Sequence, residues 1–195
     1  LNQGLERCFM ELMGIDAQAA KAVIGGLTKG NLTTSQTYEM IQNLIPNRLL
    51  IDKSPGYSSN PSVLARAEKI FGTAKYIHLI RHPLSVVESV VRMRMHALMD
   101  HSDLSPQAIA DSNWHSSNAN VASFFETLPK DRRLQVKYEE LAKSPQQVME
   151  QVSDFLGISF QDELLTPYEG KRMTDGLYKA SIPAGDPNFL SHKSI

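Results

Sequence analysis

The sequence predicts an α/β fold in which a central, mainly parallel sheet is flanked by helices. Three apolar, strand-like segments alternate with helix-like segments, at residues 48–52 (RLLID), 75–80 (KYIHLI) and 134–137 (LQVK). Strands that are separated by helices are joined by crossover connections, and these give parallel pairing. The chain has 195 residues and 42% hydrophobic content, which is enough for one sizeable core. We therefore expect a single domain over residues 1–195.

Capping and stop signals place the helices. Each begins near Asp, Ser, Thr, Asn or Pro, carries an amphipathic pattern, and ends near Gly, Pro or a polar break. We expect helices at residues 2–14, 16–27, 34–44, 61–71, 83–99, 105–128 and 145–157. Residues from 158 onward have no such pattern. The chain opens inside a helical pattern and stops abruptly, so we interpret it as an internal piece of a longer protein.

The composition argues against several classes of partner. A net charge of −1 gives no global basic field, so a nucleic-acid partner is not expected. No apolar run reaches the roughly 18 residues that a membrane span needs, and the first residues do not form a signal peptide. The single cysteine, Cys8, lies in an amphipathic stretch and predicts a small buried thiol. Without an internal disulfide, the chain fits a reducing cytoplasm.

An arginine and a serine predict an anion site after the second strand-like segment. Arg81 comes directly after that strand, Pro83 suits the first turn of the next helix, and Ser89 follows on this helix. The guanidinium fork matches phosphate oxygens, and open α/β sheets bind ligands at the carboxyl ends of their strands. Arg81 and Ser89 can therefore share one phosphate. In the alternative interpretation, Arg81 caps the helix or pairs with a carboxylate, and Ser89 is solvated.

Lys53 is a second candidate for anion chemistry. It follows residues 48–52, so its ammonium would lie at the same sheet edge as Arg81 if the two strands are neighbours. A compact ammonium on a flexible stem suits charge that develops on a leaving phosphate oxygen. Alternatively, Lys53 closes a turn by pairing with Asp52.

Other chemistry-bearing residues have structural interpretations on spacing alone. Tyr138, at the end of the third strand-like segment, is typical of a packing residue, and Glu139 is typical of a helix start. His78, in a strand interior, predicts a hydrogen-bonded core histidine. No spacing of ligands predicts a metal site.

Several motifs together resemble sulfotransferases that use 3′-phosphoadenosine-5′-phosphosulfate (PAPS). The R-x-P element with a serine eight residues after the arginine is similar to the 3′-phosphate-binding element of that family, and KSPGY is similar to its K-[ST]-P-x-Y element. In chain order, the matching segments are LERCFMELMG, KSPGY, IRHP followed by Ser89, VKYEEL, FLG and YEGKRMTDG. The resemblance implies a P-loop-type sulfotransferase fold.

The resemblance also implies site residues and a reaction. Arg81 and Ser89 would bind the 3′-phosphate, Tyr138 would lie beside the adenine, and Lys53 would face the sulfuryl group as the catalytic residue. The sulfuryl group would pass from PAPS to a substrate hydroxyl, leaving 3′-phosphoadenosine-5′-phosphate, without a metal.

The tail most resembles sulfotransferases of bacterial polyketide and olefin synthases. Their substrates imply a β-hydroxyacyl group on an acyl carrier protein, with a neighbouring thioesterase. The alternatives are a carbohydrate or small-molecule sulfotransferase, or a noncatalytic nucleotide-binding or interaction module. Met93, Met95, Leu98 and Met99 would help line the acyl channel, or they form an amphipathic core face. Arg92 and Arg94 are candidates for the contact with the carrier protein. Arg172, His192 and Lys193 would close over the nucleotide or contact the acyl chain, or they are surface residues.

The sequence departs from the family pattern at one place. The 5′-phosphosulfate loop, G-x-P-R-S-G-[TS]-T, does not occur between Leu1 and Ile195, nor does the acidic base that follows it. If residues precede Leu1 in the full protein, we expect both elements there; otherwise the chain would be a nucleotide-binding remnant. The segment after the tail motif also ends short of the family's carboxyl end.

Overall fold

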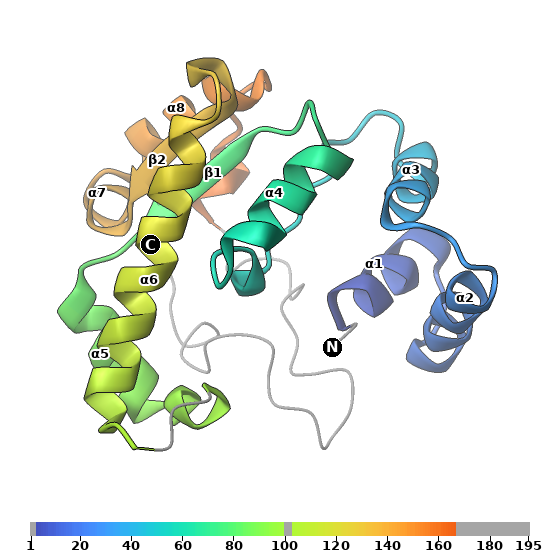
Figure 1. Ribbon diagram of the computed structural model, residues 1–195. Coiled ribbons are helices and arrows are strands. Elements are labelled where there is room, and N and C mark those ends of the chain that lie inside the picture. Colours follow the sequence, from blue (N-terminus) through green and yellow to red (C-terminus); the bar gives the residue numbers. More distant parts are fainter. Residues whose placement is uncertain (1–2, 100–102, 167–195) are drawn as a thin grey trace. The chain divides into compact units, whose positions relative to one another are not determined.

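The computed structural model describes residues 3–99 and 103–166 (Figure 1). Residues up to Asp52 belong to one compact unit, and Lys53–Leu165 form a second. A division into compact units does not decide how many domains fold independently. The single domain over residues 1–195 therefore stays a prediction.

The first unit is helical. It contains α1 (Gln3–Met13), α2 (Ala17–Lys29) and α3 (Thr34–Leu44), close to the predicted bounds. Asp16 caps α2 by accepting from the Ala19 N–H at 2.8 Å, and Thr33 forms a capping box with Gln36 at the start of α3. Its buried core consists of Phe9, Ala20, Ile24 and Ile41.

Cys8, predicted as a small buried thiol, packs against this core but is only partly buried. Burial raises the pKa of the Cys8 thiol, so the thiol form dominates at neutral pH.

The second unit contains a parallel sheet with helices around it. In chain order the elements are η1 (Pro55–Tyr57), α4 (Pro61–Ile70), β1 (Tyr76–Ile80), α5 (Pro83–Arg92), η2 (Met95–Leu98), α6 (Pro106–Glu126), η3 (Lys130–Arg132), β2 (Arg133–Lys137), α7 (Tyr138–Lys143), α8 (Pro145–Leu156) and η4 (Asp162–Leu165). Strands β1 and β2 pair in parallel, from Tyr76 opposite Arg133 to Ile80 opposite Lys137. The predicted α/β class with parallel pairing is confirmed.

Helix α6 covers one face of β1. The aromatic rings of Tyr76 and His78 on this face meet Phe124 and Phe125 of α6 edge to face, with centroids 4.9 and 5.9 Å apart. The core cluster beneath consists of Leu64, Val121, Phe125 and Leu128. In Figure 1, α6 runs alongside the strands from β2 toward α5, and it packs against α4 and α5. One long helix therefore contacts several elements of the unit.

The other face of β1 is more open than the sequence predicts. Ile77 and Leu79 are 42% and 53% exposed, although the apolar run predicted a largely buried strand. Within the described residues the sheet has two strands, so β1 has a partner on one edge only. The apolar side chains of β1 are thus only partly buried in this structure.

The first predicted strand, at residues 48–52, is wrong for the described structure. Residues 48–52 form no strand, and Leu49 and Ile51 are 48% and 71% exposed. An apolar run becomes a strand only where a neighbour accepts its backbone hydrogen bonds, and the described sheet offers none there. Helix α5 also ends earlier than predicted, at Arg92, because Arg94 adopts a positive φ of 55° before η2 begins.

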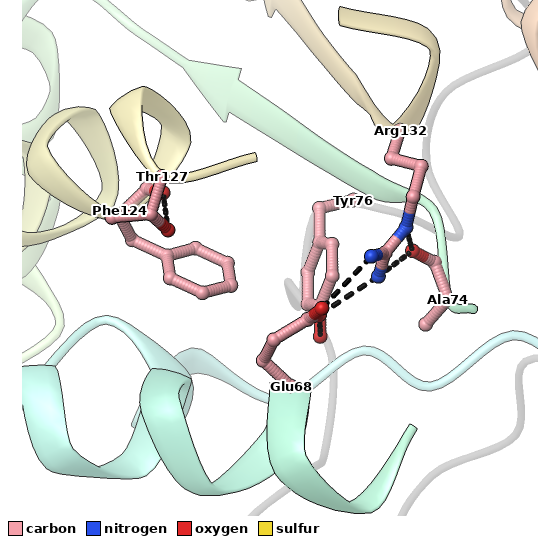
Figure 2. A network of polar contacts seen from close by, with 6 residues as sticks. All are labelled: Glu68, Ala74, Tyr76, Phe124, Thr127 and Arg132. Atoms are coloured by element: carbon pink, nitrogen blue, oxygen red, sulfur yellow. Dashed lines mark hydrogen bonds and ion pairs between the residues drawn. The ribbon is translucent and has the colours of Figure 1, made fainter. Parts of the chain in front are cut away.

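A polar network joins three elements near the start of the strands (Figure 2). Arg132 of η3 donates to both carboxylate oxygens of Glu68 on α4, at 2.8 and 2.7 Å. The same guanidinium donates to the Ala74 carbonyl, and the Tyr76 hydroxyl donates to Glu68 at 3.0 Å. The cation lowers the pKa of Glu68, so this carboxyl stays ionised.

Candidate functional site

Arg81 and Tyr138 lie together at the carboxyl end of the sheet. They follow Ile80 and Lys137, which are opposite each other in the register of β1 and β2. The Arg81 guanidinium carbon is 4.6 Å from the centroid of the Tyr138 ring, a cation–π distance. The structure thus brings together two residues that are 57 positions apart, at the edge where open α/β sheets bind ligands.

Two further side chains contact the peptide unit between Arg81 and His82. The Trp114 indole Nε1 on α6 donates to the Arg81 carbonyl at 3.0 Å. The His82 backbone N–H donates to Glu139 Oε1 on α7 at 2.8 Å. Both polar groups of this peptide unit are therefore bonded to side chains from other elements.

Glu139 stays ionised in this arrangement. The hydrogen bond from the His82 N–H is the main cause that lowers the pKa of Glu139, with its own N–H next and the nearby charge of Arg81 a smaller contribution. Glu139 and Glu140 stand in the first turn of α7, where negative side chains are favoured. The predicted interpretation of Glu139 as a helix-start residue is confirmed, and the contact with His82 adds a second role.

Ser89 lies on the helix that Pro83 starts, as predicted. Pro83 occupies the first turn of α5, and Ser89 is partly buried near its carboxyl end. The Ser89 hydroxyl contacts the Met93 sulfur at 3.9 Å, which is a weak acceptor. A hydroxyl without a strong acceptor can still donate to a phosphate oxygen. No measured contact joins Ser89 to Arg81 within the described residues, so their sharing of one anion stays a prediction.

Lys53 is exposed in the segment before η1. Because residues 48–52 form no strand, the strand-neighbour argument for placing Lys53 beside Arg81 is not supported by the described sheet. The alternative pairing with Asp52 is also not seen: Asp52 accepts a hydrogen bond from the Tyr38 hydroxyl at 2.7 Å, and Lys53 forms no ion pair with any described residue. The role of Lys53 as a catalytic residue therefore stays a prediction.

Helix α6 connects the turn after Lys53 with the end of β1. Asn120 donates to the Ser58 carbonyl at 2.9 Å, and Tyr57 packs against the α6 core cluster. Asn118, two residues earlier, contacts His78 Nε2 at 2.9 Å. Trp114, one turn earlier still, reaches Arg81. One helix thus holds both segments that carry predicted anion-binding residues.

His78 is the hydrogen-bonded core histidine that the sequence predicts. It is half-buried against Phe125 and bonded to Asn118. Desolvation lowers the pKa of His78, so the ring is neutral at physiological pH and has no role as a cationic anion ligand.

The residues at this edge fit an anionic nucleotide. Arg81 is exposed, and among the described residues its guanidinium contacts only the Tyr138 ring and lies near the Glu139 charge, without an ion pair. Tyr138 is 39% exposed, which leaves ring surface for a base. In the part of the chain that is described, no cluster of three or more His, Cys, Asp or Glu residues could hold a metal ion. Arg172, His192 and Lys193 lie outside the described residues.

Trp114 and Glu139 are the site residues that the sequence analysis missed. Their contacts with Arg81 and His82 span 33 and 57 positions, and no short motif signals such separations. Only the presence of a lone tryptophan on a polar helix offered a clue.

A parallel sheet flanked by helices, with polar side chains at the carboxyl ends of its strands, places the chain in the class of open α/β folds. Within that class the chain belongs to the sulfotransferase family, because the family model described as "Sulfotransferase family" matches residues 15–162. The predicted resemblance is confirmed.

Two solved structures are similar over the whole chain. The sulfotransferase domain from the curacin biosynthetic pathway matches with a TM-score of 0.91 and 46% identity. The sulfotransferase domain from the Synechococcus PCC 7002 olefin synthase matches with a TM-score of 0.87 and 41% identity. Both cover 100% of this chain, which spans 69% and 65% of their lengths. The predicted sulfotransferase fold is therefore confirmed.

Proposed function

We propose that the protein transfers the sulfuryl group of PAPS to the β-hydroxyl of an acyl chain held on an acyl carrier protein. The observation that carries the donor part is the Arg81 guanidinium over the Tyr138 ring at the carboxyl ends of β1 and β2. A cation beside an aromatic ring suits a nucleotide that carries both a phosphate and an adenine.

Each residue of the proposed site has a separate task. Arg81 binds the 3′-phosphate through its guanidinium fork, and Ser89 donates a hydrogen bond to the same group. Tyr138 borders the adenine. Lys53 stabilises negative charge near the transferring group. When bound, PAPS supplies the sulfuryl group, and the product nucleotide is 3′-phosphoadenosine-5′-phosphate.

The acceptor part rests on the similar structures. Both come from pathways named for curacin and olefin biosynthesis, at 46% and 41% identity to this chain. A carrier-bound β-hydroxyacyl substrate, a cytoplasmic location and a neighbouring thioesterase belong to the same proposal. None of the described helices is long and apolar enough to cross a membrane.

Nucleotide discrimination tests the donor site. Calorimetry should give tighter binding of adenosine 3′,5′-bisphosphate than of 5′-AMP, and no preference for ATP with Mg²⁺. Equal affinity for the bisphosphate and 5′-AMP would contradict the 3′-phosphate site. Preference for ATP with Mg²⁺ would indicate a kinase-like protein, and no nucleotide binding at all would indicate an interaction module.

A sulfation assay tests the acceptor. The full-length protein is given PAPS with a β-hydroxyacyl carrier protein and, separately, with oligosaccharide and phenol acceptors. We expect the mass of one sulfuryl group to be added to the carrier-bound acyl chain. Mass gain on a sugar or phenol, with none on the carrier, would refute this acceptor and leave the donor site intact.

A further inference from the structure

We infer that Trp114 and Glu139 are positioning residues, which hold Arg81 in the orientation that binds the 3′-phosphate. This inference deepens the proposed function and rests on it. Neither residue needs to touch the nucleotide. They act through the backbone of Arg81, and the geometry of one peptide unit carries the argument.

The two contacts fix the plane of a single peptide bond. The carbonyl of Arg81 and the N–H of His82 belong to the same rigid, planar unit and point in opposite directions. Trp114 holds the carbonyl at 3.0 Å from one side, and Glu139 holds the N–H at 2.8 Å from the other. A planar unit that is bonded at both ends has little freedom to rotate.

The plane of this peptide controls how Arg81 is placed relative to the helix that follows it. Its orientation sets ψ of Arg81 and φ of His82, the two torsions on either side of it. Rotation of the plane would leave the Cα–Cβ bond of Arg81 almost unchanged relative to β1 but would swing the start of α5 at Pro83, and with it Ser89, relative to Arg81. The same two contacts therefore bear on both predicted phosphate ligands, Arg81 and, through α5, Ser89.

Helix α7 contacts the side chain of Arg81 as well as the peptide unit that follows it. Tyr138, which contacts the guanidinium at 4.6 Å, is the residue directly before Glu139. The first two residues of α7 thus hold Arg81 at both ends, Tyr138 at the guanidinium and Glu139 at the peptide. An arginine that is oriented before the ligand arrives loses less side-chain freedom on binding.

The charge of Glu139 is compatible with this role. One carboxylate oxygen is engaged by the His82 N–H, and the field of Arg81 itself favours the ionised form. Trp114 lies on α6, whose neighbouring turns are tied to β1 by the Asn118–His78 contact. The indole of Trp114 therefore lies on a helix that is bonded to β1, the strand directly before Arg81.

Three variants and one control test the inference in the full-length protein. Trp114→Phe removes the indole N–H and keeps an aromatic ring, and Glu139→Ala removes the acceptor. Glu139→Gln keeps an amide oxygen that can accept from His82. Glu140→Ala is the matched control, because Glu140 is the next acidic residue of α7 and pairs with Lys137 at 3.2 Å instead.

The readout is the ratio of the dissociation constants for 5′-AMP and adenosine 3′,5′-bisphosphate. We expect Trp114→Phe and Glu139→Ala to lower this ratio by about two- to tenfold each, as the loss of one hydrogen bond does. Glu139→Gln should restore most of it, and Glu140→Ala should leave it unchanged. In a background that carries both Arg81→Ala and Ser89→Ala, neither Trp114→Phe nor Glu139→Ala should lower the ratio further.

Trp114 also gives a direct signal, because the Trp114→Phe variant identifies its indole N–H resonance. The indole N–H resonance of Trp114 should move when adenosine 3′,5′-bisphosphate binds, and move less with 5′-AMP. The His82 amide should exchange with solvent faster in Glu139→Ala than in Glu139→Gln. These signals report the contacts even where a variant is less stable.

The outcomes distinguish failure of the proposed function from failure of this inference alone. A wild-type protein that does not prefer the bisphosphate over 5′-AMP would refute the proposed function, and this inference with it. A wild-type preference that survives unchanged in folded Trp114→Phe and Glu139→Ala would refute only the inference. Equal weakening of both ligands, or a full effect in the background that lacks both Arg81 and Ser89 side chains, would refute the positioning role.

Discussion

Arg81 differs from an ordinary surface arginine in how it is held. It is exposed, yet its carbonyl, the following N–H and its guanidinium each contact a different residue, namely Trp114, Glu139 and Tyr138. A long side chain loses conformational entropy when it binds a ligand, so a residue prepared in this way binds with a smaller loss. Arg81 is therefore held in place before a ligand binds, as the proposed phosphate site requires.

Replacing the proposed phosphate ligands should weaken nucleotide binding selectively. Arg81→Ala should cost about 1.5–3 kcal/mol for a charge-assisted contact, and Ser89→Ala about 0.5–1.5 kcal/mol for a neutral one. Calorimetry with adenosine 3′,5′-bisphosphate measures both losses, and 5′-AMP is the ligand control. Arg133→Ala is the matched variant, because Arg133 begins β2 at the opposite end of the sheet. Equal losses for the two ligands would place the phosphate site elsewhere.

Lys53 should act on the transition state more than on ground-state binding. We expect Lys53→Met to lower kcat by about 10²–10³, as removal of a preorganised electrostatic donor does, with a smaller change in PAPS affinity. Steady-state kinetics of the full-length protein measure the two effects. Lys130→Met is the control, since Lys130 is an exposed lysine just before β2. If kcat is unchanged, Lys53 is a solvated lysine of the turn and has no catalytic role.

Elements with local start and stop signals were the ones that the sequence predicts well. Asp16, Thr33, Asn60 and Ser105 cap α2, α3, α4 and α6 within one or two residues of the expected starts. These signals depend on side chains within three or four positions of each other. Local chemistry of this kind can be read from the chain directly.

Elements that depend on distant partners were predicted poorly. Residues 48–52 have the composition of a strand, but a strand also needs a neighbouring edge, which composition does not reveal. The sequence indicates a helix start at Glu139 but not the extent of α7, because six residues give too short a periodic pattern. The roles of Trp114 and Glu139 were missed for the same reason as the strand, since both depend on contacts across many positions.

The Glu68–Arg132 pair should stabilise the packing of α4 against the start of the sheet. The side chains are 29% and 18% exposed, and the contact has two hydrogen bonds with charged partners (Figure 2). Glu68→Gln should lower the free energy of unfolding by about 1.5–3 kcal/mol at pH 7, measured by urea unfolding. Glu126→Gln is the control, because the Glu126–Arg133 pair is 80% exposed at Glu126 and should contribute about 0–1 kcal/mol.

The difference in unfolding free energy between the wild-type protein and Glu68→Gln should depend on pH with a definite sign. The pKa of Glu68 is lowered in the folded state, so the unfolded state binds more protons as the pH falls into the ordinary carboxyl range. The contribution of Glu68 is therefore complete above the unfolded pKa and is lost as the pH falls through the folded one. The wild-type advantage over Glu68→Gln should shrink on acidification, and an advantage that grows would contradict the ion pair.

At the scale of the whole molecule, the described site accounts for only one end of the proposed donor. Arg81, Ser89 and Tyr138 suit the 3′-phosphate and the adenine, whereas none of the 195 residues forms the loop motif that the resemblance assigns to the 5′-phosphosulfate. The two similar structures are longer, and this chain spans 69% and 65% of them. The 3′-phosphate is therefore the part of the donor on which binding tests of this chain should concentrate.

The acceptor proposal makes a prediction about the surface beyond α5. Arg92 and Arg94 are exposed, next to the partly exposed Met93 and Met95, which gives cations beside apolar surface. An acidic carrier protein would be attracted to such cations, and salt would screen the attraction. We expect Arg92→Gln with Arg94→Asn to lower kcat/KM for the carrier-bound substrate and to flatten its salt dependence. Asparagine is chosen at position 94 because φ there is 55°, a conformation that asparagine tolerates.

The control substrate for this variant carries the same β-hydroxyacyl group on free pantetheine. It presents the same reacting hydroxyl without the acidic protein surface, so its kcat/KM should not change in the double variant. Kinetics at two ionic strengths with both substrates separate recognition of the carrier from the chemical step. An equal fall for both substrates would show that Arg92 and Arg94 serve the active site or the fold and that the carrier docks elsewhere.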